Sequence, residues 1–209
     1  MMVDDAQVRD ELRAAILRGD FAPRQRLVEA DLCEQFGARR FAVRAALQDL
    51  VAEGLVERQQ NRGARIREIS LDEAIEISEI RRVVEGLVAA RAAERLTAAD
   101  AKRLTGIGRR MREAVDGGEA AVYSDLNAEL HAALREIARH ETANRIVAQL
   151  HGQMVRHQFA LSRVPGRSAV SLAQHEAVIE AVVARDPDAA EAAMRAHITS
   201  VIEVLRSLG

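Results

Sequence analysis

Three histidines are the side chains of this sequence that most directly suggest chemistry, because they recur within the apolar patterns of separate helical segments. Asn127 and His131 stand four residues apart, so a helix projects both from one face. With His175 and His197 they offer one amide oxygen and three imidazoles, which could hold a divalent metal ion and leave room for another oxygen ligand. The alternative is that each is an ordinary hydrogen-bonded core histidine, and spacing alone leaves both open. The other histidines are expected at the surface: His140, His151 and His157.

Arginines form the second group with a recognisable chemistry, in the stretch GARRFAVRAAL at residues 37–47. On a helix, Arg40 and Arg44 lie on one edge while Val43 faces inward. A guanidinium can grip the O6 and N7 atoms of guanine or bridge to a phosphate. Residues 37–67 hold seven arginines and three acids, although the whole chain has a net charge of −2. This local basic patch favours nucleic-acid binding over its alternative, a merely solvated helix face.

The composition restricts the fold class and the compartment. The 209 residues are 48% hydrophobic but only 2% aromatic, so small aliphatic side chains must build the core, which favours close helix packing and an all-α protein. The single cysteine, Cys33, excludes an intramolecular disulfide framework and fits a reducing compartment. The amino terminus is acidic, unlike a secretory signal, and no uncharged stretch approaches membrane-spanning length. We therefore expect a cytoplasmic protein without a membrane partner.

The first seventy residues follow the order of elements of a winged helix-turn-helix. Helical periodicity predicts three helices, at residues 7–17, 28–36 and about 40–54. Gly37 is placed to form the turn between the second and the third. Residues 55–69 then indicate a two-stranded hairpin around the turn NRG at 61–63. Because the third helix of such a domain lies in the major groove, we expect residues 1–69 to bind DNA.

The remainder, residues 70–209, is predicted to be helical throughout. Ser70 with Glu73 fits a capping box at the start of the first of these helices. The stretch VPGRS at 164–168 is expected to form a loop, and Pro187 suits the first turn of the last helix. Six helices suggest an antiparallel bundle. The predicted fold class is mainly α, with a winged helix-turn-helix followed by a helical bundle.

The first domain resembles the amino-terminal domain of the GntR family of bacterial transcription regulators, over the segment VRDELRAAILRGDFAPRQRLVEADLCEQFGARRFAVRAALQDLVAEGLVERQQNRGARI. The resemblance rests on the order of glycine, arginine, valine, arginine and leucine along the third helix, followed by EGLV and RG. It implies that operator DNA is contacted by Arg39, Arg40 and Arg44 on that helix and by Arg62 and Gly63 on the wing. The sequence departs from the family at Arg39, Phe41 and Ala42, where serine or threonine, threonine and proline are common, which implies an altered operator preference.

The bundle is similar to the FCD effector-binding domain of the FadR branch of that family, and its six helices resemble the VanR-like subgroup. The similarity lies in EIRRVVEG at 79–86, NAELH at 127–131 and SLAQHEAVIEAVVARDPDAAEAAMRAHI at 171–198. It implies a zinc or nickel ion bound by four residues, Asn127, His131, His175 and His197. A small carboxylate effector would then complete the coordination. Arg81 matches an arginine that pairs with the effector, and the alternative for it is a salt bridge to Glu85.

Asn127 stands where such domains more often have aspartate, and a neutral oxygen contributes less charge to a cation. The resemblances together imply a regulator that binds double-stranded operator DNA as a homodimer and senses a small carboxylate. Two alternatives stay open, a metal-dependent enzyme with an accessory DNA-binding domain and a DNA-binding dimer without an effector. We expect no enzyme, because no HExxH motif occurs and Glu129 and Glu176 are predicted to point away from the histidines. Tyr123, one turn before Asn127, is assigned to packing.

Overall fold

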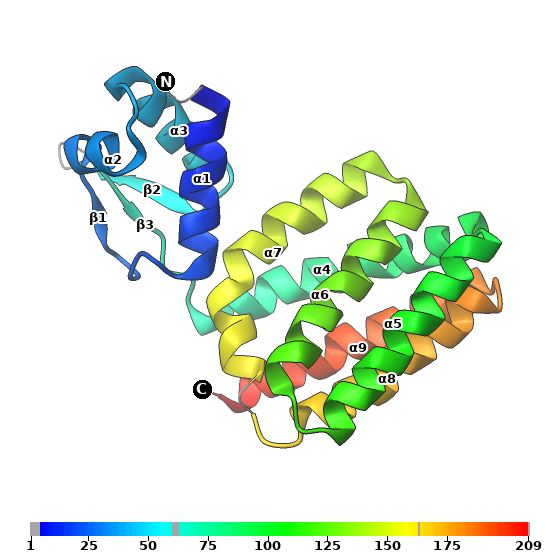
Figure 1. Cartoon of the computed structure of the whole chain (residues 1–209). Coiled ribbons are helices and arrows are strands. Elements are labelled where there is room, and N and C mark those ends of the chain that lie inside the picture. The colour runs from blue at the N-terminus through cyan, green and yellow to red at the C-terminus, as the bar shows by residue number, and fades with distance from the viewer. Residues whose placement is uncertain (1–4, 60–62, 163, 209) are drawn as a thin grey trace. The chain divides into compact units, whose positions relative to one another are not determined.

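A computed structural model describes residues 5–59, 63–162 and 164–208 (Figure 1). Residue contacts divide the chain into two compact units, Met1–Ser70 and Leu71–Gly209. Each unit has its own cluster of buried apolar side chains. We call them the first unit and the bundle, and each is described by itself.

The first unit combines helices with a small sheet. Its elements are α1 (Asp5–Arg18), β1 (Arg26–Leu27), α2 (Glu29–Phe36), α3 (Arg40–Ala52), β2 (Val56–Gln59) and β3 (Gly63–Ile66). Val8 and Leu12 of α1 pack with Val43 and Leu50 of α3 in a fully buried core. Gly37 ends α2 in the left-handed region, with a φ of 60°, where a residue without a Cβ atom meets no steric penalty. The predicted winged helix-turn-helix is confirmed.

The sheet of the first unit has three strands, whereas the sequence predicted a hairpin of two. β1 pairs antiparallel with β3, which gives the order β1-β3-β2. A strand of two residues is too short to show the alternation of apolar and polar residues that predicts strands. The extra strand buries Leu27 in the core and brings the start of α2, at Glu29, next to the hairpin.

The bundle has six helices in the described residues, as predicted. They are α4 (Leu71–Arg95), α5 (Ala98–Asp116), α6 (Ala120–Ala138), α7 (Glu141–Ser162), α8 (Arg167–Val183) and α9 (Pro187–Ser207). α4 is the central helix, because it packs against α6, α7, α8 and α9 (Figure 1). Its buried face is rich in alanine, including Ala89, Ala92 and Ala93, which lets neighbouring helices approach closely.

Local sequence sets the ends of several bundle helices. Thr97 and Asp100 form a reciprocal capping box at the start of α5. Asp186 caps α9 with its side chain, directly before Pro187. α8 starts earlier than predicted, so Arg167 lies in its first turn and not in a loop. Within the described residues, no helix is both long and apolar enough to cross a membrane.

Candidate DNA-binding face and metal centre

Arg40 and Arg44 lie on the exposed edge of α3, while the opposite side of the helix packs into the core. Their side chains are 72% and 58% exposed. With Arg26 and Arg58 they line a concave surface, which encloses a volume of about 630 Å³. Residues of α2, α3 and the sheet all contribute to it. Glu29 is the acid that lines the same surface. Four guanidinium groups around one carboxylate make this face attractive to a polyanion.

Glu29, at the start of α2, binds both arginines of the α3 edge, and sequence reasoning missed it. The Nε atoms of Arg40 and Arg44 each donate to Oε2 of Glu29 at 2.9 Å, and Arg44 also donates to Oε1 at 3.0 Å. The hydrogen bonds from Arg44 and Arg40 lower the pKa of Glu29. These bonds use only Nε, so the two terminal nitrogens of each guanidinium stay outside them. Glu29 thus holds both groups in place without consuming the fork that could bind DNA.

The remaining residues proposed for DNA binding from the sequence flank this face. Arg39 is an exposed residue directly before α3. Gly63 begins β3 with a φ of 85° and lines the same concave surface. Arg62 lies outside the described residues. The first unit therefore presents Arg39, Arg40, Arg44 and Gly63 on elements that adjoin one another.

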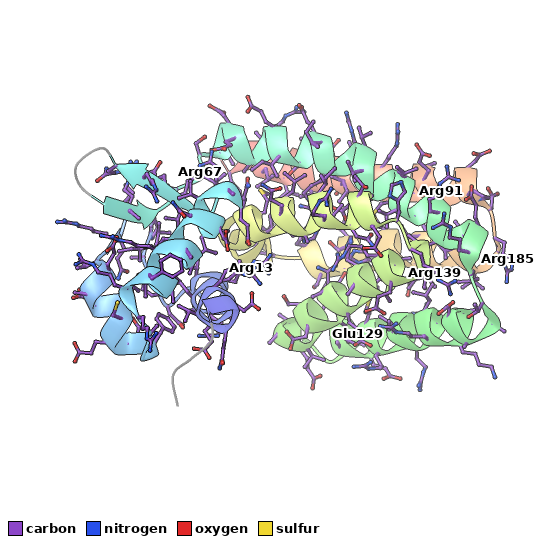
Figure 2. The ribbon with its side chains drawn as sticks, turned by 90° about the horizontal axis from the view of Figure 1, so that it is seen from above. Arg13, Arg67, Arg91, Glu129, Arg139 and Arg185 are labelled. Carbon is purple, nitrogen blue, oxygen red and sulfur yellow. The ribbon has the colours of Figure 1, made fainter. Side chains whose placement is uncertain are left out.

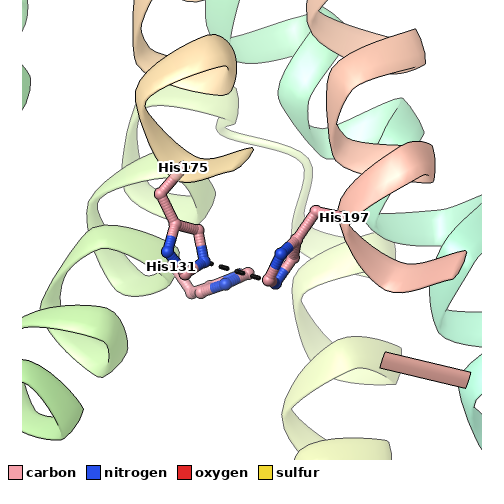
Figure 3. Close-up of side chains that lie close together, drawn as sticks. All are labelled: His131, His175 and His197. Carbon is pink, nitrogen blue, oxygen red and sulfur yellow. Dashed lines mark hydrogen bonds between the residues drawn. The ribbon is translucent and has the colours of Figure 1, made fainter. Parts of the chain in front are cut away.

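His131, His175 and His197 come together inside the bundle from α6, α8 and α9 (Figure 3). The three residues are 6%, 1% and 5% exposed. The ring centroid of His131 is 5.5 Å from that of His175 and 5.6 Å from that of His197. The Nε2 atoms of His175 and His197 are 3.2 Å apart. One ring nitrogen from each histidine lies within 4.8 Å of the others, which is close enough for one ion to contact all three.

The ring nitrogen Nδ1 of each histidine is bonded to a partner at the edge of the cluster. The pairs are His131 Nδ1 with Glu85 Oε2 at 3.0 Å, His175 Nδ1 with Tyr123 Oη at 3.0 Å, and His197 Nδ1 with Gln174 Oε1 at 3.1 Å. A carboxylate or amide oxygen can only accept, so His131 and His197 each donate a hydrogen bond from Nδ1 to these partners. Such outer partners orient metal-binding histidines in proteins. Tyr123, assigned to packing from the sequence, is buried and also orients His175.

Burial favours the uncharged forms of His175, His197 and Tyr123. Burial, followed by nearby imidazoles and Arg167, lowers the pKa of His175 well below its usual range. Burial is also the main cause of the strongly lowered pKa of His197. Burial raises the pKa of Tyr123 to about 12, so its hydroxyl keeps its proton. Neutral imidazole is the form that binds a metal ion, because protonation removes the lone pair.

Asn127 supplies a polar atom that has no partner of its own. It lies one turn before His131 on α6, and its side-chain oxygen Oδ1 is buried without a hydrogen-bond partner among the described residues. Leaving a buried acceptor unsatisfied costs about 1–3 kcal/mol. An ion held by the three histidines would give this oxygen a partner. The donor set of three nitrogens and one oxygen therefore fits a divalent ion of the zinc type.

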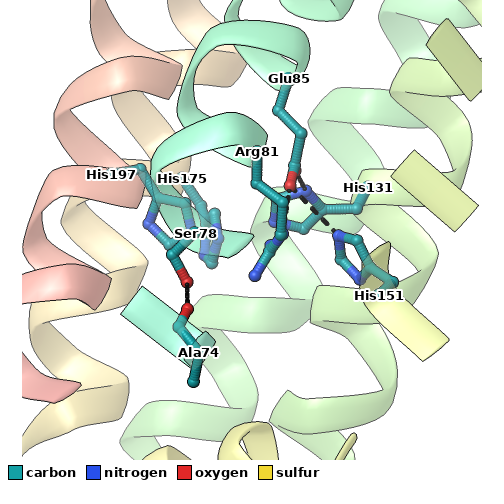
Figure 4. A network of polar contacts seen from close by, with 8 residues as sticks. All are labelled: Ala74, Ser78, Arg81, Glu85, His131, His151, His175 and His197. Atoms are coloured by element: carbon teal, nitrogen blue, oxygen red, sulfur yellow. Dashed lines mark hydrogen bonds and ion pairs between the residues drawn. The ribbon is translucent and has the colours of Figure 1, made fainter. Parts of the chain in front are cut away.

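Glu85 connects the histidine cluster to α7 and to Arg81 (Figure 4). Its Oε1 accepts a hydrogen bond from Arg81 Nε at 2.8 Å and lies 3.2 Å from His151 Nε2. Burial acts to raise the pKa of Glu85, but Arg81, His151 and His131 together hold it well below its usual value. Glu85 is therefore a carboxylate that balances the charge of Arg81 and orients two imidazoles. Of the two sequence-based alternatives for Arg81, the salt bridge is present.

The prediction that His151 lies at the surface is wrong. Its side chain is 25% exposed, and burial, the largest cause, lowers its pKa to about 4. It contacts Glu85 because α7 packs against α4, a neighbourhood that the α7 sequence does not reveal. Glu85, His131 and His151 form a second group of close metal-ligand atoms, which shares His131 with the first group.

Family comparisons agree with the geometry of both units. Residues 5–66 match the family model of bacterial regulatory proteins, gntR family, and residues 76–200 match the FCD domain. The chain belongs to the GntR family. It is a transcription regulator with an FCD domain, as the resemblance in its sequence implied.

Related proteins and solved structures extend over nearly the whole chain. The HTH-type transcriptional regulator LutR of Bacillus subtilis is 31% identical over 212 residues, covering 91% of this chain and 95% of LutR. The HTH-type transcriptional repressor RspR of Escherichia coli K12 is 27% identical over 202 residues, covering 97% of this chain and 89% of RspR. The solved structure of E. coli McbR/YncC covers 99% of both chains with a TM-score of 0.80 at 21% identity, which shows the shared fold.

Proposed function

We propose that this GntR regulator binds a palindromic operator as a homodimer, and that a small carboxylate bound at a metal centre in the bundle controls this binding. The observation that carries the proposal is the cluster of three buried imidazoles from three helices, with the oxygen of Asn127, unpartnered among the described residues, one turn before His131. Each imidazole is oriented by a partner on its Nδ1 atom. The Nε2 atoms of His175 and His197 share a hydrogen bond at 3.2 Å, which an ion bound at these atoms would replace.

DNA recognition is assigned to the arginine edge of α3 and to the wing. Arg40 and Arg44 would contact base edges or phosphates with their terminal nitrogens, and Arg39 would contact the adjacent backbone. Arg62 and Gly63 would approach the duplex from the wing. One such unit covers too few base pairs for useful specificity, so two units related by a dyad are the expected arrangement.

The metal ion, zinc or nickel, would be held by Asn127, His131, His175 and His197. When bound, it supplies an electrophilic position that a carboxylate oxygen can occupy. Burial keeps His175 and His197 neutral, and the partners on the Nδ1 atoms fix the orientation of all three imidazoles. Arg81 is a candidate for contact with the effector through its terminal nitrogens, although Glu85 already balances its charge.

A metal-dependent enzyme is the alternative, and the surroundings of the cluster give it less support. Glu129, labelled in Figure 2, pairs with the exposed Arg110 at 3.1 Å, and Glu176 pairs with the exposed Arg112 at 2.6 Å. Neither carboxylate is therefore available as a general base at the histidines. The relatives described above are regulators as well.

The DNA-binding part is tested with an operator selected by the purified protein from a pool of random duplexes. Arg44→Ala should weaken binding to this duplex by about 10- to 100-fold, because a bidentate base contact contributes about 1–3 kcal/mol. Arg18→Ala is the matched control. Arg18 is an exposed arginine of the same unit, at the carboxyl end of α1, and it pairs with Asp20 just beyond that helix. Fluorescence anisotropy measures both. Equal affinity of the Arg44→Ala and Arg18→Ala proteins would contradict the assignment.

A further inference from the structure

We propose that Arg167 binds a second anionic group of the effector, so that the ligand is a short dicarboxylate and not a monocarboxylate. The inference rests on the proposed function and specifies the class of ligand. One carboxylate would occupy the open position at the metal centre, and the other would pair with the Arg167 guanidinium.

Arg167 is a buried cation whose bonded partner is a neutral group. It is 8% exposed, and its Nη1 atom donates to Ser200 Oγ at 2.7 Å. In the part of the chain that the structure describes, no carboxylate pairs with it. The neighbouring sequence offers no counter-ion, because no aspartate or glutamate stands between Glu141 and Glu176. A buried charge without a counter-ion is costly, so Arg167 is prepared for an anion that the chain itself does not provide.

The second buried arginine of the bundle, Arg81, is in the opposite situation. Its Nε atom donates to Glu85 at 2.8 Å, and both side chains are buried. A ligand carboxylate at Arg81 would have to share the guanidinium with Glu85, whereas at Arg167 it would displace no charged partner. The guanidinium fork of Arg167 can bind a carboxylate through two parallel hydrogen bonds.

Arg167 is on the same side of the bundle interior as the histidines. Arg167, Ser171 and His175 follow one another at intervals of four residues, so they share one face of α8, and all three are buried. On α9, Ser200 lies one turn after His197, which amounts to about 5 Å of rise along the helix. The guanidinium that binds Ser200 is thus one helical turn away from a proposed metal ligand. A short carbon chain between two carboxylates can bridge such a separation.

The charges of the interior favour a ligand with two negative groups. The Asn127 amide carries no charge, and the Glu85 carboxylate is paired with Arg81 at 2.8 Å, so neither offers an unpaired negative charge. A divalent ion and Arg167 would therefore leave the cluster with surplus positive charge. A monocarboxylate would neutralise only the position at the ion, whereas a dicarboxylate would also neutralise Arg167.

The experiment compares dicarboxylates with monocarboxylates of equal carbon number on zinc-loaded, full-length protein. Malonate, succinate and glutarate are paired with propionate, butyrate and valerate, and calorimetry measures each affinity at pH 7. For the best chain length, wild-type protein should bind the dicarboxylate at least about tenfold more tightly, because charged hydrogen bonds are the stronger class. The preference should vanish in Arg167→Gln and persist in Arg81→Gln. Zinc content is measured for every sample.

Several outcomes would overturn the proposal. These are no dicarboxylate preference in the wild type, a preference that survives in Arg167→Gln, or a preference that only Arg81→Gln removes. Should Arg167→Gln fail to fold, Arg167→Lys replaces it, and its point charge should reduce the preference without abolishing it. Failure of the proposed function would look different, because the wild type would then bind no zinc or would keep its operator in the presence of every carboxylate.

Discussion

The two units of this regulator treat their arginines in opposite ways. In the first unit, Arg40 and Arg44 are exposed and share the carboxylate of Glu29 at the rim of a concave surface. In the bundle, Arg81 and Glu85 form an ion pair that is almost wholly buried. Exposed ion pairs contribute about 0–1 kcal/mol, whereas removing one partner of a buried pair costs about 3–5 kcal/mol. Surface charges can therefore exchange partners with DNA at little cost, while charges in the bundle hold a fixed arrangement.

The largest expected effect is that of His175→Ala, which should remove the response to the ligand and leave DNA binding itself intact. His175→Ala should abolish the change in operator affinity caused by the carboxylate that binds best in calorimetry, because the ligand would lose its position at the metal. In other allosteric proteins, binding of one ligand changes the affinity for the other by about 5- to 150-fold. Operator affinity without ligand should stay at the wild-type value, since α3 is untouched. His140→Ala, a change outside the cluster, should retain the full response in the same anisotropy assay, and an unchanged response in His175→Ala would contradict the account.

The second-largest expected effect is that of Glu85→Gln on the affinity for zinc. Glu85→Gln should weaken zinc binding by about 10- to 100-fold, because His131 loses the carboxylate that orients it. Competition with a chromophoric chelator measures the dissociation constant, and circular dichroism verifies that the variant is folded. Glu94→Gln, which changes an exposed carboxylate of the same helix that pairs with Arg91, serves as the control. Equal zinc affinity in the two variants would show that Glu85 does not position a ligand.

Acid should destabilise the bundle and spare the first unit, because all six histidines stand at residue 131 or later. His151 has a pKa of about 4 in the folded protein, against about 6.5 in an unfolded chain. Between these values the unfolded state binds more protons, so the bundle loses stability as the pH falls from about 6.5 towards 4. For His151 alone the loss from pH 7 to pH 5 is about 2 kcal/mol. The lowered pKa values of His175 and His197 act in the same direction.

Thermal unfolding of metal-free protein at pH 7 and pH 5 measures this loss. The transition that belongs to the bundle should move to lower temperature at pH 5, and it should move less in His151→Gln. A transition that stays in place or rises on acidification would mean that these histidines are not held neutral.

The smallest expected effect is that of Glu29. Glu29→Gln should change the free energy of unfolding by less than about 1 kcal/mol, since its ion pairs are exposed. It should tighten binding to a duplex without operator by about three- to tenfold at low salt, because a negative charge leaves the face that meets the phosphates. Glu34→Gln, on the same helix, is the control. Weaker non-specific binding by Glu29→Gln would indicate that Glu29 mainly positions the arginines.

The sequence predicted the features that depend on local patterns and missed those that depend on neighbours in space. The apolar periodicity placed the bundle helices, and the spacing of Asn127 and His131 put both on one helix face. Glu85 and His151 were not linked to the histidines, because their meeting requires α4 to pack against both α6 and α7. Glu29 was missed for the same reason, since it reaches Arg44 across the turn between two helices.

Elemental analysis of the protein decides whether the bundle histidines form a metal centre. Untagged protein, purified without chelator or nickel resin, is compared with a His131→Ala, His175→Ala double variant of matched concentration and verified fold. Wild-type protein should contain close to one zinc or nickel ion per chain, and the double variant should contain none. Absence of metal from both proteins after zinc is added, or equal amounts in both, would contradict the proposed metal centre.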